Sequence, residues 1–139
     1  MAVEAALRYQ IGNPIDFTVA NGMAFEKGLI LGLLDPMTAS GASAAGVACA
    51  GIAAVEKVAG DGSTKLSVWR SGIFDIYVSG AITIGAPLMI DAATTISSNY
   101  LRAASGADTA SGAIIVGHAL ETGSAGEQIL VQLTLAGGS

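Results

Sequence analysis

Reactive side chains are scarce in this chain of 139 residues. It holds one cysteine and one histidine, which excludes an intrachain disulfide and leaves too few ligands for the usual zinc sites. Six Lys and Arg stand against eleven Asp and Glu, and the net charge is -5. Phosphate contacts need clustered cations, so this balance argues against nucleic-acid binding and against a polybasic membrane anchor. We therefore expect no metal, no cofactor, and no nucleic-acid, membrane or small-molecule partner.

Long runs of large apolar residues are also missing, although 52% of the chain is hydrophobic. The 26 Ala and 19 Gly residues account for much of that fraction. The longest uncharged stretch, from Pro36 to Val55, is mostly Ala, Gly, Ser and Thr, so it does not predict a transmembrane helix. Small residues instead suit the tight turns and closely spaced backbones of β-rich folds.

Turn signals recur at short intervals, and the runs between them predict short strands. The predicted strands are Ile15–Ala20, Leu29–Leu34, Gly51–Val55, Lys65–Arg70, Ile73–Val78, Pro87–Asp91, Tyr100–Ala103, Ile114–Leu120 and Gln128–Leu135. Two further segments are expected to be loops, the first with at most a weak helical turn: Thr38–Ala48 and Ser105–Gly112. The pattern indicates an all-β fold, a small β-barrel or sandwich forming one domain over residues 15–139.

The chain contains an internal echo, which predicts a duplicated, pseudosymmetric barrel. Each half has a Gly-led apolar strand, then a variable loop, a second strand, a Gly-rich turn and a closing strand. The corresponding segments are Phe25–Leu31 with Ile82–Leu88, Ala50–Glu56 with Val116–Glu121, Gly60–Ser63 with Gly123–Gly126, and Lys65–Arg70 with Gln128–Leu135. Two copies are too few for a solenoid.

The first fourteen residues stand outside this repeat and are expected to form an extended arm. Leu7, Tyr9 and Ile11 alternate with polar residues, so an extended chain would place their side chains on one face. Pro14 favours an extended exit from the arm. Two alternatives are open: the arm forms the edge of a sheet in its own domain, or it lies on another chain.

No set of residues predicts catalysis. His118 lies in a predicted strand, and Glu121, three residues on, would point to the opposite face. Cys49 lies among small apolar residues without an activating cation, so we expect a core residue. Carboxylates at strand ends, such as Asp75 and Asp91, leave an enzyme as a less favoured alternative.

Three large aromatic residues lie in two consecutive predicted strands: Trp69, Phe74 and Tyr77. Core packing accounts for one or two of them. Trp and Tyr are enriched at subunit interfaces, and a core built largely of Ala and Gly gains from burying more area against other copies. We therefore expect a homotrimer in which these aromatic residues line the interface.

The order of several short motifs resembles the capsid decoration (cement) proteins of tailed bacteriophages. The motifs are Phe17–Gly22, Lys27–Ile30, Ala50–Ala53, Gly60–Gly62, Ser71–Asp75, Ile84–Leu88, Gly117–Thr122 and Ala125–Val131. The resemblance covers about residues 15 to 135 and implies a structural protein of the virion, not an enzyme. Such proteins sit on the outer capsid surface, often as trimers, and clamp neighbouring major capsid subunits.

Within that interpretation, the arm is the predicted capsid clamp. Its predicted capsid-binding residues are Leu7, Arg8, Tyr9, Ile11 and Pro14. Docked as an added strand, the arm would satisfy its backbone groups on a partner's sheet edge.

The alternative function is a swinging-lysine carrier of the biotinyl or lipoyl type, which is also a small duplicated β-barrel. Such a domain needs a modified lysine at an exposed hairpin tip. Lys65 enters a predicted strand, and Lys27 lacks the expected flanking residues. A covalent biotin or lipoate found by mass spectrometry would favour this alternative.

Overall fold

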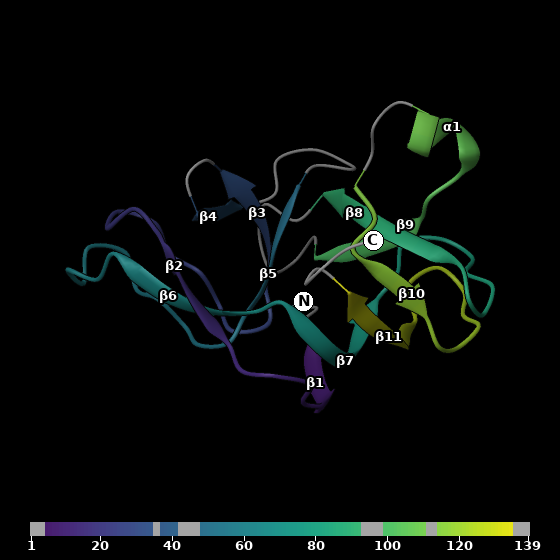
Figure 1. The fold of residues 1–139 in the computed structure, drawn as a ribbon, viewed down its shortest axis with the longest axis horizontal. Helices are drawn as coiled ribbons and strands as arrows, with labels where there is room; N and C mark the ends of the chain where they lie inside the picture. The colour runs from purple at the N-terminus through teal and green to yellow at the C-terminus, as the bar shows by residue number, and fades with distance from the viewer. Residues whose placement is uncertain (1–4, 35–36, 42–47, 93–98, 111–113, 135–139) are drawn as a thin grey trace.

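The computed structural model describes residues 5–34, 37–41, 48–92, 99–110 and 114–134, and these ranges are almost entirely β (Figure 1). The elements are β1 (Ala6–Tyr9), β2 (Ile15–Thr18), β3 (Ile30–Leu34), β4 (Thr38–Gly41), β5 (Cys49–Ala53), β6 (Lys65–Trp69), β7 (Ser71–Tyr77), β8 (Pro87–Ala92), β9 (Tyr100–Ala103), α1 (Gly106–Ala110), β10 (Gly117–Ala119) and β11 (Gln128–Thr134). Strands β2–β6 close a barrel in the order β2-β4-β3-β5-β6, which we name the first unit. The second unit is a six-stranded sheet in the order β1-β7-β11-β10-β8-β9.

The strand pairings confirm the predicted duplication. In the first unit β2 pairs with β6, β3 with β4 and β5, and β5 with β6, all antiparallel. In the second unit β7, β8, β9, β10 and β11 repeat this set in the same order. Even the parallel contact recurs, as Thr18 with Thr38 and as Val78 with Leu101. Each half of the sequence therefore builds its own unit.

The two units are joined by a nearly continuous strand. β6 ends at Trp69 and β7 begins at Ser71, so Arg70 alone separates them. In Figure 1 this teal ribbon runs from the first unit into the second.

Two predicted loops contain regular structure. Thr38–Gly41 forms β4, although its sequence of small residues carries little strand signal; residues 42–47 lie outside the described part of the chain. The second predicted loop, Ser105–Gly112, contains the short helix α1. Ser105 and Asp108 form a capping box at its start, in which each side chain accepts a hydrogen bond from the backbone N–H of the other. In the described ranges, no helix has the length and apolar character needed to cross a membrane.

Each unit has its own apolar core. The interior of the first unit is filled by Phe17, Val19, Phe25, Leu29, Leu31, Ala39, Ala50, Ala53, Leu66 and Val68. The core of the second unit centres on side chains such as Phe74, Ile76 and Val131. Ile30 and Ile52, from the first unit, point out of their own barrel and join the second core. This shared packing fixes one unit against the other.

A buried amide also links the units. Asn99, which is 0% exposed, precedes β9 in the second unit. Its side-chain carbonyl accepts a hydrogen bond from the Ile30 N–H at 2.7 Å, and its amide donates to the Gly28 carbonyl at 2.8 Å. The side chain thus satisfies the buried Ile30 N–H at the start of β3 and gives the Gly28 carbonyl a second donor besides the Ala5 N–H.

A glycine occupies the same place in each unit, at the closest approach of two strands. A Cβ built on Gly51 of β5 would lie 2.0 Å from the Trp69 carbonyl oxygen, and one on Gly117 of β10 would lie 2.2 Å from that of Gln132. Both obstacles are backbone atoms, so neither can move aside without opening the sheet.

We predict that Gly117→Ala lowers the free energy of unfolding by about 2–4 kcal/mol, because the new methyl must displace the β11 backbone. Urea unfolding followed by circular dichroism measures the change. Gly80→Ala is the matched control, since a Cβ there meets nothing within 4 Å. Equal stability of the two variants would contradict the steric explanation.

Asn99→Ala should lower the free energy of unfolding by about 1–3 kcal/mol, because the buried Ile30 N–H loses its partner and the Gly28 carbonyl keeps only the Ala5 N–H. The same denaturation experiment applies. Asn13→Ala, at an exposed site, should change stability by less than about 0.5 kcal/mol. A neutral Asn99→Ala variant would show that the amide contributes nothing to joining the units.

Candidate interaction surfaces

The N-terminal segment is part of the chain's own second sheet. β1 pairs antiparallel with β7 and forms the edge of the six-stranded sheet. Arg8 donates to the Asp75 carboxylate at 2.7 Å, and the Ser71 hydroxyl donates to the Ile11 carbonyl. The sequence leaves open whether the arm forms a sheet edge in its own domain or lies on another chain. Residues 6–9 form a sheet edge in their own chain.

The prediction that Leu7, Tyr9 and Ile11 share one face is wrong for the first two residues. Leu7 lies opposite Phe74, whereas Tyr9 lies opposite Ile73, because a bulge interrupts the register between Leu7 and Tyr9. Phe74 and Ile73 are successive residues of β7 and face opposite sides of the sheet. Tyr9 accordingly lies on the outer face, 61% exposed, and Leu7 on the inner face, 37% exposed.

The three aromatic residues predicted at an oligomer interface have different environments. Phe74 is 1% exposed and belongs to the second core, so it has no surface to offer a partner and its assignment to an interface is wrong. Trp69 and Tyr77 are half-buried. Trp69 and Leu7 line one pocket of about 560 Å³ between β1 and the first unit. The core alternative thus holds for Phe74.

A second hollow, the β2 groove, lies at one end of the first barrel. Its volume is about 520 Å³, and its lining is Ile15, Phe17, Leu33, Leu34, Met37 and Arg70. Leu34 and Met37 are each 54% exposed and Ile15 is 46% exposed. The Arg70 guanidinium lies 5.6 Å from the centre of the Phe17 ring and donates to the Ala50 carbonyl. The groove is therefore apolar, with one cation.

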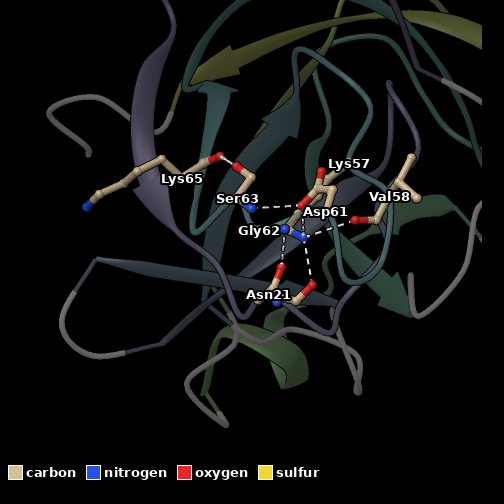
Figure 2. A network of polar contacts seen from close by, with 7 residues as sticks. All are labelled: Asn21, Lys57, Val58, Asp61, Gly62, Ser63 and Lys65. Atoms are coloured by element: carbon tan, nitrogen blue, oxygen red, sulfur yellow. Dashed lines mark hydrogen bonds and ion pairs between the residues drawn. The ribbon is translucent and has the colours of Figure 1, made fainter.

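A buried lysine holds the long turn that connects β5 to β6. The Lys57 side chain is 2% exposed, and its ammonium donates to the Asn21 carbonyl, the Val58 carbonyl and the Asp61 carboxylate (Figure 2). Asn21 also accepts from the Gly62 N–H, and Asp61 accepts from the Ser63 N–H. No sequence pattern marks Lys57, because one of its three acceptors, the Asn21 carbonyl, belongs to a turn 36 residues away in the sequence. The prediction of a tight turn at Gly60–Ser63 agrees with this arrangement.

The residues weighed for catalysis do not converge. His118 is exposed opposite Gln132, while the Glu121 carboxylate accepts a hydrogen bond from the Leu130 N–H. Burial raises the pKa of the Cys49 thiol to about 12, so the reactive thiolate is disfavoured. Among the residues with described positions, no cluster of three His, Cys, Asp or Glu side chains is arranged to hold a metal ion.

The two carboxylates considered for an enzyme and the two lysines considered for a carrier domain lie in four separate places. Asp75 pairs with Arg8, and Asp91 lies 3.4 Å from Arg102. Lys65 opens β6 and donates to the Thr18 hydroxyl, and Lys27 lines the pocket beside Leu7. Lys65 thus lies within a strand, whereas Lys27 is exposed in the turn before β3.

Comparison with known proteins agrees with this arrangement of strands. The sequence matches the family described as phage cement protein over residues 9–135. No curated protein matches it. Among solved structures, the head fiber gp8.5 N base of bacteriophage phi29 is similar at a TM-score of 0.53 and 14% identity, covering 87% of this chain and 92% of that one. At this identity the likeness concerns the fold.

The strands and the family match together define a small all-β structural protein of phages. The chain belongs to the phage cement protein family. Membership places it among the structural cement proteins of phages, which are not a class of enzymes, and gives it a capsid-binding structural role.

Stability should depend on the charge of Asp61. The Ser63 N–H and the Lys57 ammonium hold the pKa of Asp61 below its ordinary value. A lowered folded-state pKa stabilises the protein above the unfolded-state value of about 4, and this stabilisation is lost as the pH falls through the folded-state pKa. Asp61→Asn should therefore unfold more easily than the wild type near neutral pH, and the difference should shrink in acid. Denaturation across a pH series measures it; a pH-independent difference would contradict the assignment.

Proposed function

We propose that this protein binds the outer surface of a phage head and clamps neighbouring major capsid subunits, with the N-terminal segment as its main contact. The contact residues are Leu7, Arg8, Tyr9, Ile11 and Pro14. The observation that carries the proposal is the exposure of two large apolar side chains, Tyr9 at 61% and Ile11 at 44%, along one segment at a sheet edge; Leu7, on the inner face of that edge, is 37% exposed. Family membership supports the capsid as the partner.

The pairing of β1 with β7 changes how the segment would work. A free arm must lose its conformational freedom on binding, whereas β1 is already ordered in its sheet. Burying Tyr9 and Ile11 against the shell would contribute about 3–6 kcal/mol before the remaining costs of association. Arg8 holds the segment through Asp75. Within the contact, its role is then to orient the segment through this ion pair.

A homotrimer is part of the same proposal. Trp69 and Tyr77 keep part of their aromatic surface accessible, and both residue types are common at subunit interfaces. Three linked copies would strengthen attachment to the head if their geometry lets all of them engage at once. Sedimentation of the isolated protein tests this state, and a monomer both free and on heads would contradict it.

We predict that Tyr9→Ser combined with Ile11→Ser weakens binding to undecorated heads by at least about tenfold, because exposed aromatic and aliphatic anchors carry much of an interface's energy. Co-sedimentation of purified heads with the protein measures the affinity. Thermal unfolding should be unchanged, since both side chains are exposed.

The matched control replaces two equally exposed apolar side chains elsewhere. Val58 is 62% exposed and Ile84 63% exposed, and both lie in turns away from β1. Val58→Ser combined with Ile84→Ser should bind heads as the wild type does. Full binding by the Tyr9 and Ile11 variant would show that the N-terminal segment is not the clamp.

A further inference from the structure

The duplication allows the edges of the two units to be compared position by position. The Val19 N–H donates to the Thr64 carbonyl, and the Val78 N–H donates to the Glu127 carbonyl, at the corresponding ends of β2 and β7. Counting back from these two valines, Asp16 of β2 corresponds to Asp75 of β7. Ile15 likewise corresponds to Phe74.

In the second unit, a further strand occupies the side of β7 that faces away from β11. That strand is β1, with Ala6 opposite Asp75 and Leu7 opposite Phe74. Two of its side chains make the contact specific. Leu7 lies on the inner face beside the core, and Arg8 pairs with the Asp75 carboxylate at 2.7 Å.

In the first unit, the described residues leave the corresponding position beside β2 open. There β2 meets β4 at a single pair, Thr18 with Thr38, and the Thr18 N–H donates to the Met37 carbonyl. Because main-chain groups alternate sides along a strand, the Asp16 N–H and carbonyl face this same open side. β6 covers the other side of β2 over its whole length.

The open position adjoins an apolar cavity and a carboxylate. The β2 groove begins at Ile15, and Leu34 and Met37 on its rim are each 54% exposed. Met37 has a φ of 43°, in the left-handed region that costs energy for a side chain of this size. The Asp16 carboxylate accepts only the Ser67 hydroxyl among the described side chains, whereas its counterpart Asp75 has an arginine.

We propose that the open side of β2 is a second docking site, which receives an extended segment of the capsid partner as an antiparallel strand. The segment would pair with the Asp16 main chain, insert an apolar side chain into the β2 groove opposite Ile15, and place a basic side chain on the Asp16 carboxylate. This is the chemistry that Leu7 and Arg8 supply beside β7. The inference rests on the proposed function.

The charge requirement favours the capsid over a second copy of this chain. The chain is acidic, with a net charge of -5 and only six Lys and Arg. Arg8, Lys57 and Arg102 already pair with carboxylates of their own chain. A second copy therefore has few basic side chains to offer Asp16.

Binding of undecorated heads by charge and groove variants tests the site. Asp16→Lys and, separately, Leu34→Ser should each weaken binding by at least about tenfold without changing thermal unfolding. Glu56→Lys, an exposed change of the same charge in the same unit, and Val58→Ser should stay within about twofold of the wild type. Hydrogen exchange should also show the Asp16 amide unprotected in the free protein and protected on heads.

Each outcome separates the hypotheses. If Tyr9→Ser with Ile11→Ser loses binding while Asp16→Lys and Leu34→Ser bind normally, the proposed function stands and the second site is overturned. Absence of Asp16 protection on heads also overturns it. If Asp16→Lys reduces self-association but not head binding, the occupant is a second copy and the proposal fails. If the wild type does not bind heads, the proposed function fails and the second site fails with it.

Discussion

Both units depend on one constraint: a glycine of one strand lies directly against the backbone of the next, at Gly51 in the first unit and at Gly117 in the second. At each point the backbones of two antiparallel strands approach so closely that a Cβ would overlap a carbonyl oxygen. At these points β5 lies against β6 and β10 against β11, and only glycine leaves room for the approach. A β-protein rich in Ala and Gly thus gains tight packing between strands where it lacks large side chains.

The two units share one topology but not one environment. Ile52 and Trp69 pair across β5 and β6, and their counterparts, His118 and Gln132, pair across β10 and β11. Ile52 is buried against the second unit, whereas His118 faces solvent. The backbone hydrogen bonds beside these two pairs are the same. The presence of apolar residues in one pair and polar residues in the other therefore follows from the difference in burial. The same strand topology thus carries different side chains according to what each unit packs against.

Local patterns predicted much of the fold, and contacts between distant residues account for the errors. Turn residues and the internal echo located most strands and the duplication. Strand β4 was missed because its small residues form a strand only beside β3, and α1 was missed although Ser105 and Asp108 have capping-box spacing. The bulge that separates the faces of Leu7 and Tyr9 depends on the register with β7, and the burial of Phe74 depends on the second core. Alternation within one segment reveals neither.

The nearly continuous strand formed by β6 and β7 has a mechanical consequence. Its two halves belong to different units, with Arg70 alone between them, and each half is central to an antiparallel ladder, with β2 and with β11. A force that separates the units acts along this strand. Because the inter-strand hydrogen bonds run perpendicular to the strands, such a force loads them in shear and at the same time. Rupture must then break many bonds in one event instead of unzipping them in turn. Such an arrangement resists tension in the direction of the strand far better than across it.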